Sequence, residues 1–141
     1  MNSKEAKARI KINKLLEEAG WRFFEEHGKP ANILLEPSVK ISKNQIYEMG
    51  ENFDKVKTGF VDFLLLDEKG YPFIVLEAKS EEKDPLVGKE QARAYAKSFN
   101  VKYVILSNGN LHYFWDMYKG NPQIIVSFPS CEDIKNSKVF N

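Results

Sequence analysis

The sequence predicts an α/β fold in which a central mixed β-sheet is flanked by helices on both faces. Two apolar strands at residues 60–66 and 71–79, joined by a turn at 67–70, predict a β-hairpin. Both strands are apolar on both faces, which is typical of a sheet covered on both sides. The helix expected at 84–99 leads to a strand at 101–106, and such a crossover favours parallel pairing with the hairpin's second strand.

An amphipathic helix is expected first, over residues 5–19. Its apolar side chains share one sector of a helical wheel: Ala8, Ile12, Leu15, Leu16 and Ala19. Ser3 is a candidate N-cap, and Gly20 is a typical stop signal. Glu5 falls within the same apolar sector, so we expect an acid on the buried face of the first turn.

The stretch from 28 to 59 is the hardest to interpret, because prolines and glycines divide it into short pieces. Residues 33–36 and 39–41 are candidate short strands. Lys55 and Lys57 make the end of this stretch basic.

The elements after the hairpin carry clearer signals. Asp84 is a typical N-cap and Pro85 a typical first-turn residue for the helix that runs to about Phe99. The pair at 108–109, Asn-Gly, predicts a tight turn into a strand at 111–115.

The C-terminal part is expected to contain one more strand, at 123–128. After Pro129 the chain is polar, and we expect a loosely held tail from about residue 131. No linker or repeat divides the chain, so a single domain over residues 1–141 is expected.

Composition narrows the class of protein. The chain has 141 residues, 43% of them hydrophobic, and its ten Phe, six Tyr and two Trp exclude disorder as the main state. The 21 Lys and Arg residues nearly balance the 20 Asp and Glu residues, so the net charge is +1. A protein that holds nucleic acid unaided is usually far more basic.

Cys131 is the only cysteine, so no disulfide can form within the chain and a cysteine-based zinc site is not expected. The first residues show no signal peptide. The apolar runs around 63–66 and 73–76 are far shorter than the ~20 residues that cross a bilayer. We therefore expect a cytoplasmic protein with no membrane partner.

Three charged residues interrupt or end the apolar hairpin strands, where charge is rarely tolerated. Asp62 lies within the first strand, and Glu77 and Lys79 end the second. Because side chains alternate along a strand, Glu77 and Lys79 share one face of the sheet. This cluster is the main candidate for chemistry.

The hairpin register decides how near the two acids lie. If Asp67 pairs with Gly70, Asp62 lies opposite Val75 and diagonal to Glu77, at a Cα separation of roughly 7–8 Å. Two carboxylates this close repel each other unless a cation lies between them. Mg²⁺ prefers such oxygen ligands and keeps several waters.

A Mg²⁺ ion at this place would polarise a phosphoryl oxygen and lower the pKa of an attacking water. Lys79 would offset developing negative charge or orient the nucleophile. The pattern therefore points to phosphodiester hydrolysis. The structural alternative is a solvated strand end or a salt bridge, since a Glu-x-Lys triplet alone occurs by chance in many proteins. Asp62, on the neighbouring strand with matching parity, favours the catalytic interpretation.

These residues resemble the PD-(D/E)XK nuclease superfamily. Gly59-Phe-Val-Asp62, then Glu77-Ala-Lys79, then the Gln-x-x-x-Tyr segment of Gln91 and Tyr95 are similar to its RecB-like branch. Residues 83–92 more narrowly resemble the N-terminal nuclease domain of type I restriction enzyme R subunits. Further similarities lie at 19–21, 107–109, 113–116 and 128–130, so the resemblance spans most of the chain.

The resemblance implies a restriction-endonuclease-like PD-(D/E)XK core with Asp62 and Glu77 as metal-binding acids. It implies that the Ala78 carbonyl adds a metal ligand and that Lys79 is the catalytic lysine. Val61 stands where the family's name has proline, a departure that leaves the acids in place.

The helices would complete this site. Gln91 and Tyr95, one turn apart on one helix face, would support the site or contact DNA phosphate. The family often has an acid on its first helix, and Glu5 is the candidate for a further metal ligand. Its alternative role is a partly exposed first-turn acid favoured by the helix dipole.

The resemblance further implies a Mg²⁺-dependent DNA endonuclease domain of a type I restriction-modification system, with Mn²⁺ able to substitute. Family proteins are far longer, add motor domains and work with modification and specificity subunits. The chain has no Gly-x-x-x-x-Gly-Lys-Ser/Thr loop, so no ATP site is expected here. We expect an isolated domain or a truncated product.

Two alternatives remain open. The chain can be a catalytically inactive nuclease-fold module for DNA binding or docking, or another nuclease of this fold such as a junction resolvase, against which residues 83–92 argue. His27, His112 and Cys131 show no metal or triad spacing. Four basic side chains of the second helical region face either a DNA backbone or only solvent: Lys83, Lys89, Arg93 and Lys97.

Overall fold

The computed structural model describes residues 3–37 and 61–140 of the chain. The elements in chain order are α1 (Ser3–Glu18), β1 (Ile33–Leu35), β2 (Phe63–Leu66), β3 (Pro72–Ala78), the 3₁₀ helix η2 (Pro85–Gly88), α3 (Lys89–Phe99), β4 (Tyr103–Ser107), β5 (His112–Asp116), β6 (Gln123–Ile125) and α4 (Cys131–Lys135). The predicted strand at 39–41, the basic Lys55 and Lys57, and Phe60 lie outside the described residues.

The six strands form one sheet in the order β1-β2-β3-β4-β5-β6. Strands β3 and β4 pair in parallel, and the other neighbours pair antiparallel. The parallel pair arises because η2 and α3 carry the chain from the end of β3 back to the start of β4. The mixed sheet and its helical crossover are therefore confirmed.

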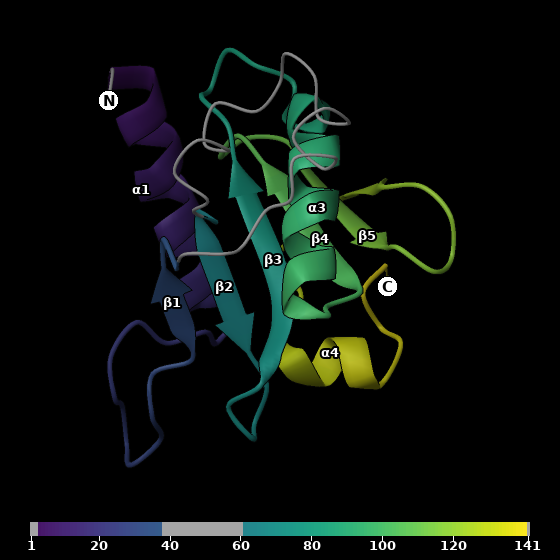
Figure 1. Cartoon of the computed structure of the whole chain (residues 1–141). Helices are drawn as coiled ribbons and strands as arrows, with labels where there is room; N and C mark the ends of the chain where they lie inside the picture. The colour runs from purple at the N-terminus through teal and green to yellow at the C-terminus, as the bar shows by residue number, and fades with distance from the viewer. Residues whose placement is uncertain (1–2, 38–60, 141) are drawn as a thin grey trace.

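Helices cover both faces of the sheet, as predicted (Figure 1). On one face α1 buries Ile12 and Leu16 in a cluster with strand residues such as Leu76. On the other face Tyr95 of α3 packs with Val75 and other strand residues. Among the described residues, no helix has the length and apolar character needed to cross a membrane.

Helix α1 matches the predicted helix within two residues, but the buried position expected for Glu5 is wrong. Glu5 is exposed, whereas the next residues of the apolar sector, such as Ala8, are buried. The first turn extends past the strands, and there Lys4 pairs with Glu82 of the loop after β3 (Figure 1). A helical wheel predicts the direction of a side chain but not whether the sheet reaches that far.

The hairpin forms with a register two residues away from the predicted one. Phe63 pairs with Leu76 and Leu64 with Val75, so Asp62 lies level with the end of β3 rather than opposite Val75. The turn is wider than expected, because the Asp67 carboxylate accepts hydrogen bonds from the backbone N–H groups of residues 69 and 71. A two-residue shift keeps every side chain on its face, so Asp62 and Glu77 still share one.

The C-terminal segment is more ordered than predicted. Strand β6 ends at Ile125, and Phe128 is buried in the core. A capping box of Ser130 and Asp133 begins the short helix α4, and Ile134 of this helix is buried. The expected loose tail from residue 131 is therefore wrong for this helix, because its one apolar side chain reaches the sheet.

Candidate active site

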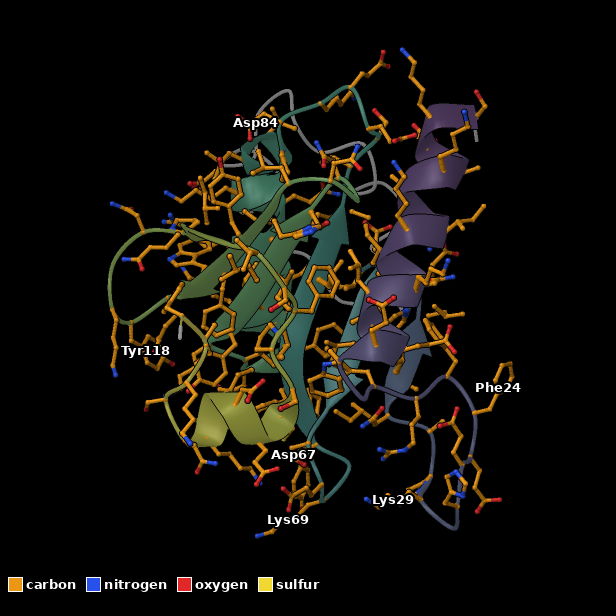
Figure 2. All side chains as sticks on the ribbon, turned by 180° about the vertical axis from the view of Figure 1, so that it is seen from behind. Phe24, Lys29, Asp67, Lys69, Asp84 and Tyr118 are labelled. Atoms are coloured by element: carbon orange, nitrogen blue, oxygen red, sulfur yellow. The ribbon has the colours of Figure 1, made fainter. Side chains whose placement is uncertain are left out.

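The candidate site lies where β3 ends. Glu77 is 1% exposed and Lys79 is 8% exposed, so both charged side chains are buried. In Figure 2 Asp84, which begins the crossover after β3, lies at one end of the molecule, and Asp67 and Lys69 of the hairpin turn lie at the opposite end. The site is therefore built at the carboxyl end of β3, away from the hairpin turn.

Asp62 is anchored to the same strand end. Its Oδ2 accepts a hydrogen bond from the Ala78 backbone N–H at 2.8 Å, and the residue is fully buried. Ala78 follows Glu77 directly, so the Asp62 carboxylate is bonded to the backbone next to the second acid. The structure thus brings together the two acids and the lysine that the sequence pattern singles out.

A polar link from α3 supports the lysine. Lys79 Nζ donates to Gln91 Oε1 at 3.4 Å, and Gln91 Nε2 donates to the Tyr95 hydroxyl at 3.1 Å. Burial raises the pKa of Tyr95 to about 12, while the hydrogen bond from Gln91 lowers it and the charge of Glu77 raises it. Glu77 therefore acts electrostatically on Tyr95, and Gln91 and Tyr95 belong to the same local assembly.

Gly88, at the end of η2, allows this close approach. A Cβ atom at Gly88 would lie 3.0 Å from Lys79 Cε and 3.1 Å from Glu77 Cγ. The predicted N-cap is confirmed, since Asp84 accepts a hydrogen bond from the Leu86 N–H. The first turn is a 3₁₀ helix rather than an α-helix, and this turn sets the glycine against the two charged side chains.

The first helix contributes a cation to this region. Arg9 Nη1 donates to Asp62 Oδ1 at 2.9 Å, and Arg9 Nη2 lies 3.2 Å from Glu36 Oε1. The guanidinium also lies over the Phe63 ring, 5.3 Å from its centroid. Arg9 lies at the margin of the apolar sector of α1, one turn after Glu5. This position is the feature of the sequence that could have indicated a contact between Arg9 and the sheet.

The donor set fits a hard divalent cation. Both acids offer only carboxylate oxygens, and Mg²⁺ typically uses one or two carboxylates and keeps its remaining ligands as water. Within residues 3–37 and 61–140, no group of three or more His, Cys, Asp or Glu residues could hold a metal ion. Glu5 and the Ala78 carbonyl therefore stay predicted ligands.

His112 makes contacts within the fold rather than with the candidate site. His112 Nδ1 lies 2.7 Å from Ser107 Oγ, and its ring packs edge-on against Phe128. The Ser107 carbonyl accepts the backbone N–H of Lys79, so this pair lies behind the candidate site. Burial lowers the pKa of His112, which keeps the ring neutral at physiological pH.

Comparison with known proteins supports a family assignment. The family model of the type I restriction enzyme R protein N terminus (HSDR_N) matches residues 34–129. A solved fragment assigned to the HsdR subunit of a type I restriction enzyme from Vibrio vulnificus YJ016 is similar, with a TM-score of 0.69 and 23% identity. The match covers 96% of this chain and 25% of that chain, so this chain spans about a quarter of its length.

No curated protein matches the chain. The family model spans Asp62, the Glu77–Lys79 triplet, Gln91 and Tyr95, so the residues that meet at the end of β3 all lie within the matched region. On this match, the chain belongs to the family of type I restriction enzyme R protein N termini.

Proposed function

We propose that the chain is a Mg²⁺-dependent DNA endonuclease domain that hydrolyses phosphodiester bonds for a type I restriction enzyme. The observation that carries this proposal is the meeting of Asp62, Glu77 and Lys79 at the end of β3, with Asp62 bonded to the Ala78 N–H. Buried charged residues that gather at one strand end favour a functional site over a solvated edge.

Each residue has its own role in this proposal. Asp62 and Glu77 would hold the ion, with the Ala78 carbonyl as a further ligand. Mg²⁺ when bound supplies polarisation of a phosphoryl oxygen and a lowered pKa of the attacking water, and Mn²⁺ is expected to substitute. Lys79 would neutralise developing charge on the phosphate or orient the water, while Gln91 and Tyr95 hold its ammonium group in place.

The test is DNA cleavage by purified variants. Supercoiled plasmid is incubated with the chain and Mg²⁺ or Mn²⁺, and D62N, E77Q and K79A are each expected to abolish nicking while circular dichroism shows an intact fold. K69A is the matched control, because Lys69 is an exposed lysine of the hairpin turn at the opposite end of the molecule. Equal cleavage by the wild type and all three site variants would show that the site is assigned wrongly.

The wider partners follow from the family. Because this chain spans a quarter of the similar HsdR fragment, we propose that motor domains lie elsewhere in a longer R subunit. We further propose that modification and specificity subunits deliver this domain to DNA. No Walker-type loop occurs in the 141 residues, so ATP hydrolysis is assigned to another part of the assembly.

A second candidate function is a non-catalytic docking or DNA-binding module with the same fold. The Arg9–Asp62 contact favours it, because a guanidinium satisfies the buried carboxylate without a metal ion. This candidate predicts no cleavage and no Mn²⁺ binding that depends on Asp62 and Glu77. The endonuclease candidate predicts both.

A further inference from the structure

Arg9 is a positive charge placed against one of the two metal-binding candidates. Its Nη1 lies 2.9 Å from Asp62 Oδ1, and the Asp62 side chain is 1% exposed. The other oxygen, Oδ2, accepts the Ala78 N–H at 2.8 Å. Both carboxylate oxygens of Asp62 are therefore engaged, one of them by a full positive charge.

A divalent cation at Asp62 would meet this guanidinium directly. Two cations within a few ångströms of one buried carboxylate repel strongly, because little water lies between them to screen the charges. Binding of the ion therefore favours movement of the guanidinium away from Oδ1. The geometry makes Arg9 and the metal ion alternative partners of the same oxygen.

Glu36 already contacts the other end of the guanidinium. Its Oε1 lies 3.2 Å from Arg9 Nη2, and its side chain is 54% exposed, in contrast to Asp62. Glu36 adopts a left-handed backbone with φ 49, and its N–H donates to the Asp62 carbonyl, which fixes its place beside Asp62. The Phe63 ring also lies under the guanidinium, and its centroid lies 5.3 Å from Arg9 Cζ.

We propose that Arg9 is an exchangeable counter-ion of Asp62. In the metal-free protein it neutralises the buried carboxylate, and on metal binding it leaves Asp62 Oδ1 and is held by Glu36 alone. The inference rests on the proposed metal-dependent function. It adds a positioning residue from α1 that weakens metal binding, one turn after Glu5, the acid that the family resemblance offers as a further ligand.

The test is the affinity for Mn²⁺, measured by electron paramagnetic resonance of the free ion without DNA. R9Q is expected to bind Mn²⁺ roughly 5- to 100-fold more tightly than the wild type, the usual range of coupling between two sites. K14Q is the matched control, because it removes one exposed positive charge from the same helix and should change the affinity by less than about twofold. R9K keeps the charge and should stay close to the wild type.

Glu36 gives a second test with the opposite sign. E36Q removes the carboxylate that would hold the guanidinium away from Asp62. Arg9 then stays on Asp62, and Mn²⁺ binding should weaken. In an R9Q background the same E36Q change should have little effect, because Glu36 acts through Arg9. A simple loss of negative charge would weaken binding equally in both backgrounds and would count against the exchange.

E77Q separates the failure of this inference from that of the proposed function. If Mn²⁺ binding requires Glu77, and R9Q binds equally or more weakly, Arg9 does not compete and the inference is overturned while the metal site stands. If neither the wild type nor R9Q binds Mn²⁺ in a Glu77-dependent way, both proposals fail. Thermal unfolding of each variant shows whether an altered affinity comes from a folded protein.

Discussion

Gln91 shows how one side chain can serve two others. Its amide oxygen accepts from Lys79, and its amide nitrogen donates to Tyr95, so the amide orientation is set from both ends. Because the three side chains are buried, none of these bonds is readily replaced by water. Burial raises the pKa of Tyr95 to about 12, so its hydroxyl keeps its proton at physiological pH.

His112 leads to a prediction about pH. Burial lowers its pKa below the ordinary value of 6.5, so the unfolded chain binds the proton more readily than the folded chain. The contribution of neutral, buried His112 to the free energy of unfolding is fully present above pH 6.5. It is lost as the pH falls from 6.5 towards the lowered pKa. We expect the free energy of unfolding to decrease in that window, as measured by urea denaturation.

The matched variants are H112Q and H27Q. H112Q should flatten the acid limb of the stability profile, whereas H27Q should not, because His27 is exposed. An unchanged acid limb in H112Q would mean that other groups cause the loss of stability.

At the residue scale, the sequence predicted which side chains of the hairpin come together. Side-chain alternation alone places Glu77 and Lys79 on one face, and Asp62 joins them because the error in the predicted register was an even number of residues. Arg9 was not predicted, because a helical wheel gives direction but not reach, and a long guanidinium side chain crosses from the edge of the apolar sector to Asp62.

Among the elements, the short helix η2 carries the most specific prediction. Gly88 has φ −89, which any residue adopts, so a Gly88→Ala change meets only the side chains of Lys79 and Glu77. We expect G88A to lower cleavage between about tenfold and a hundredfold by displacing the lysine. The free energy of unfolding should fall by roughly 1–3 kcal/mol, as is typical of overpacking.

G120A is the control for this variant. Gly120 has φ +120 and open space around its Cβ position, so the substitution strains the backbone away from the site. G120A should lose stability without losing cleavage per folded molecule. Equal effects of both variants on cleavage would argue against a positioning role for Gly88.

Element boundaries were predicted less well than element order. Two local features shifted the hairpin by one residue each: the turn closes Asp67 on Tyr71 rather than on Gly70, and the pairing shifts again between Leu65 and Leu66. The expected loose tail is instead a short ordered helix, because the capping box fixes its start and the buried Ile134 holds it against the sheet. Such tertiary contacts are not visible in local sequence patterns.

On the scale of the whole molecule, the candidate site is assembled from segments far apart in the chain. Helix α1 reaches the loop after β3 through the ion pairs Lys4–Glu82 at 2.8 Å and Lys11–Glu81 at 2.6 Å. The turn at Gly109 packs against the α1 backbone, since a Cβ there would lie 3.2 Å from it. The end of the sheet, the first helix and the crossover therefore depend on each other.

The charge of the molecule bears on how it meets DNA. The net charge is +1, and part of the basic surface is already engaged, because Lys89 and Arg93 both lie over the Trp115 ring. Lys4 and Lys11 are likewise paired with acids. These four cations are thus partly engaged within the protein, and the buried Glu77 at the end of β3 disfavours a DNA backbone until a cation is bound.

The isolated chain is therefore expected to bind duplex DNA weakly. We predict a Kd above about 1 µM at ~150 mM salt, within the range of non-specific binding, measured by fluorescence anisotropy with E77Q protein to prevent cleavage. Mutating exposed Lys97 together with Lys83 to glutamine should reduce the slope of log Kd against log salt by about 1–2, if both contact phosphate. Submicromolar binding at that salt would show that the domain holds DNA by itself, and delivery by partner subunits would then be unnecessary.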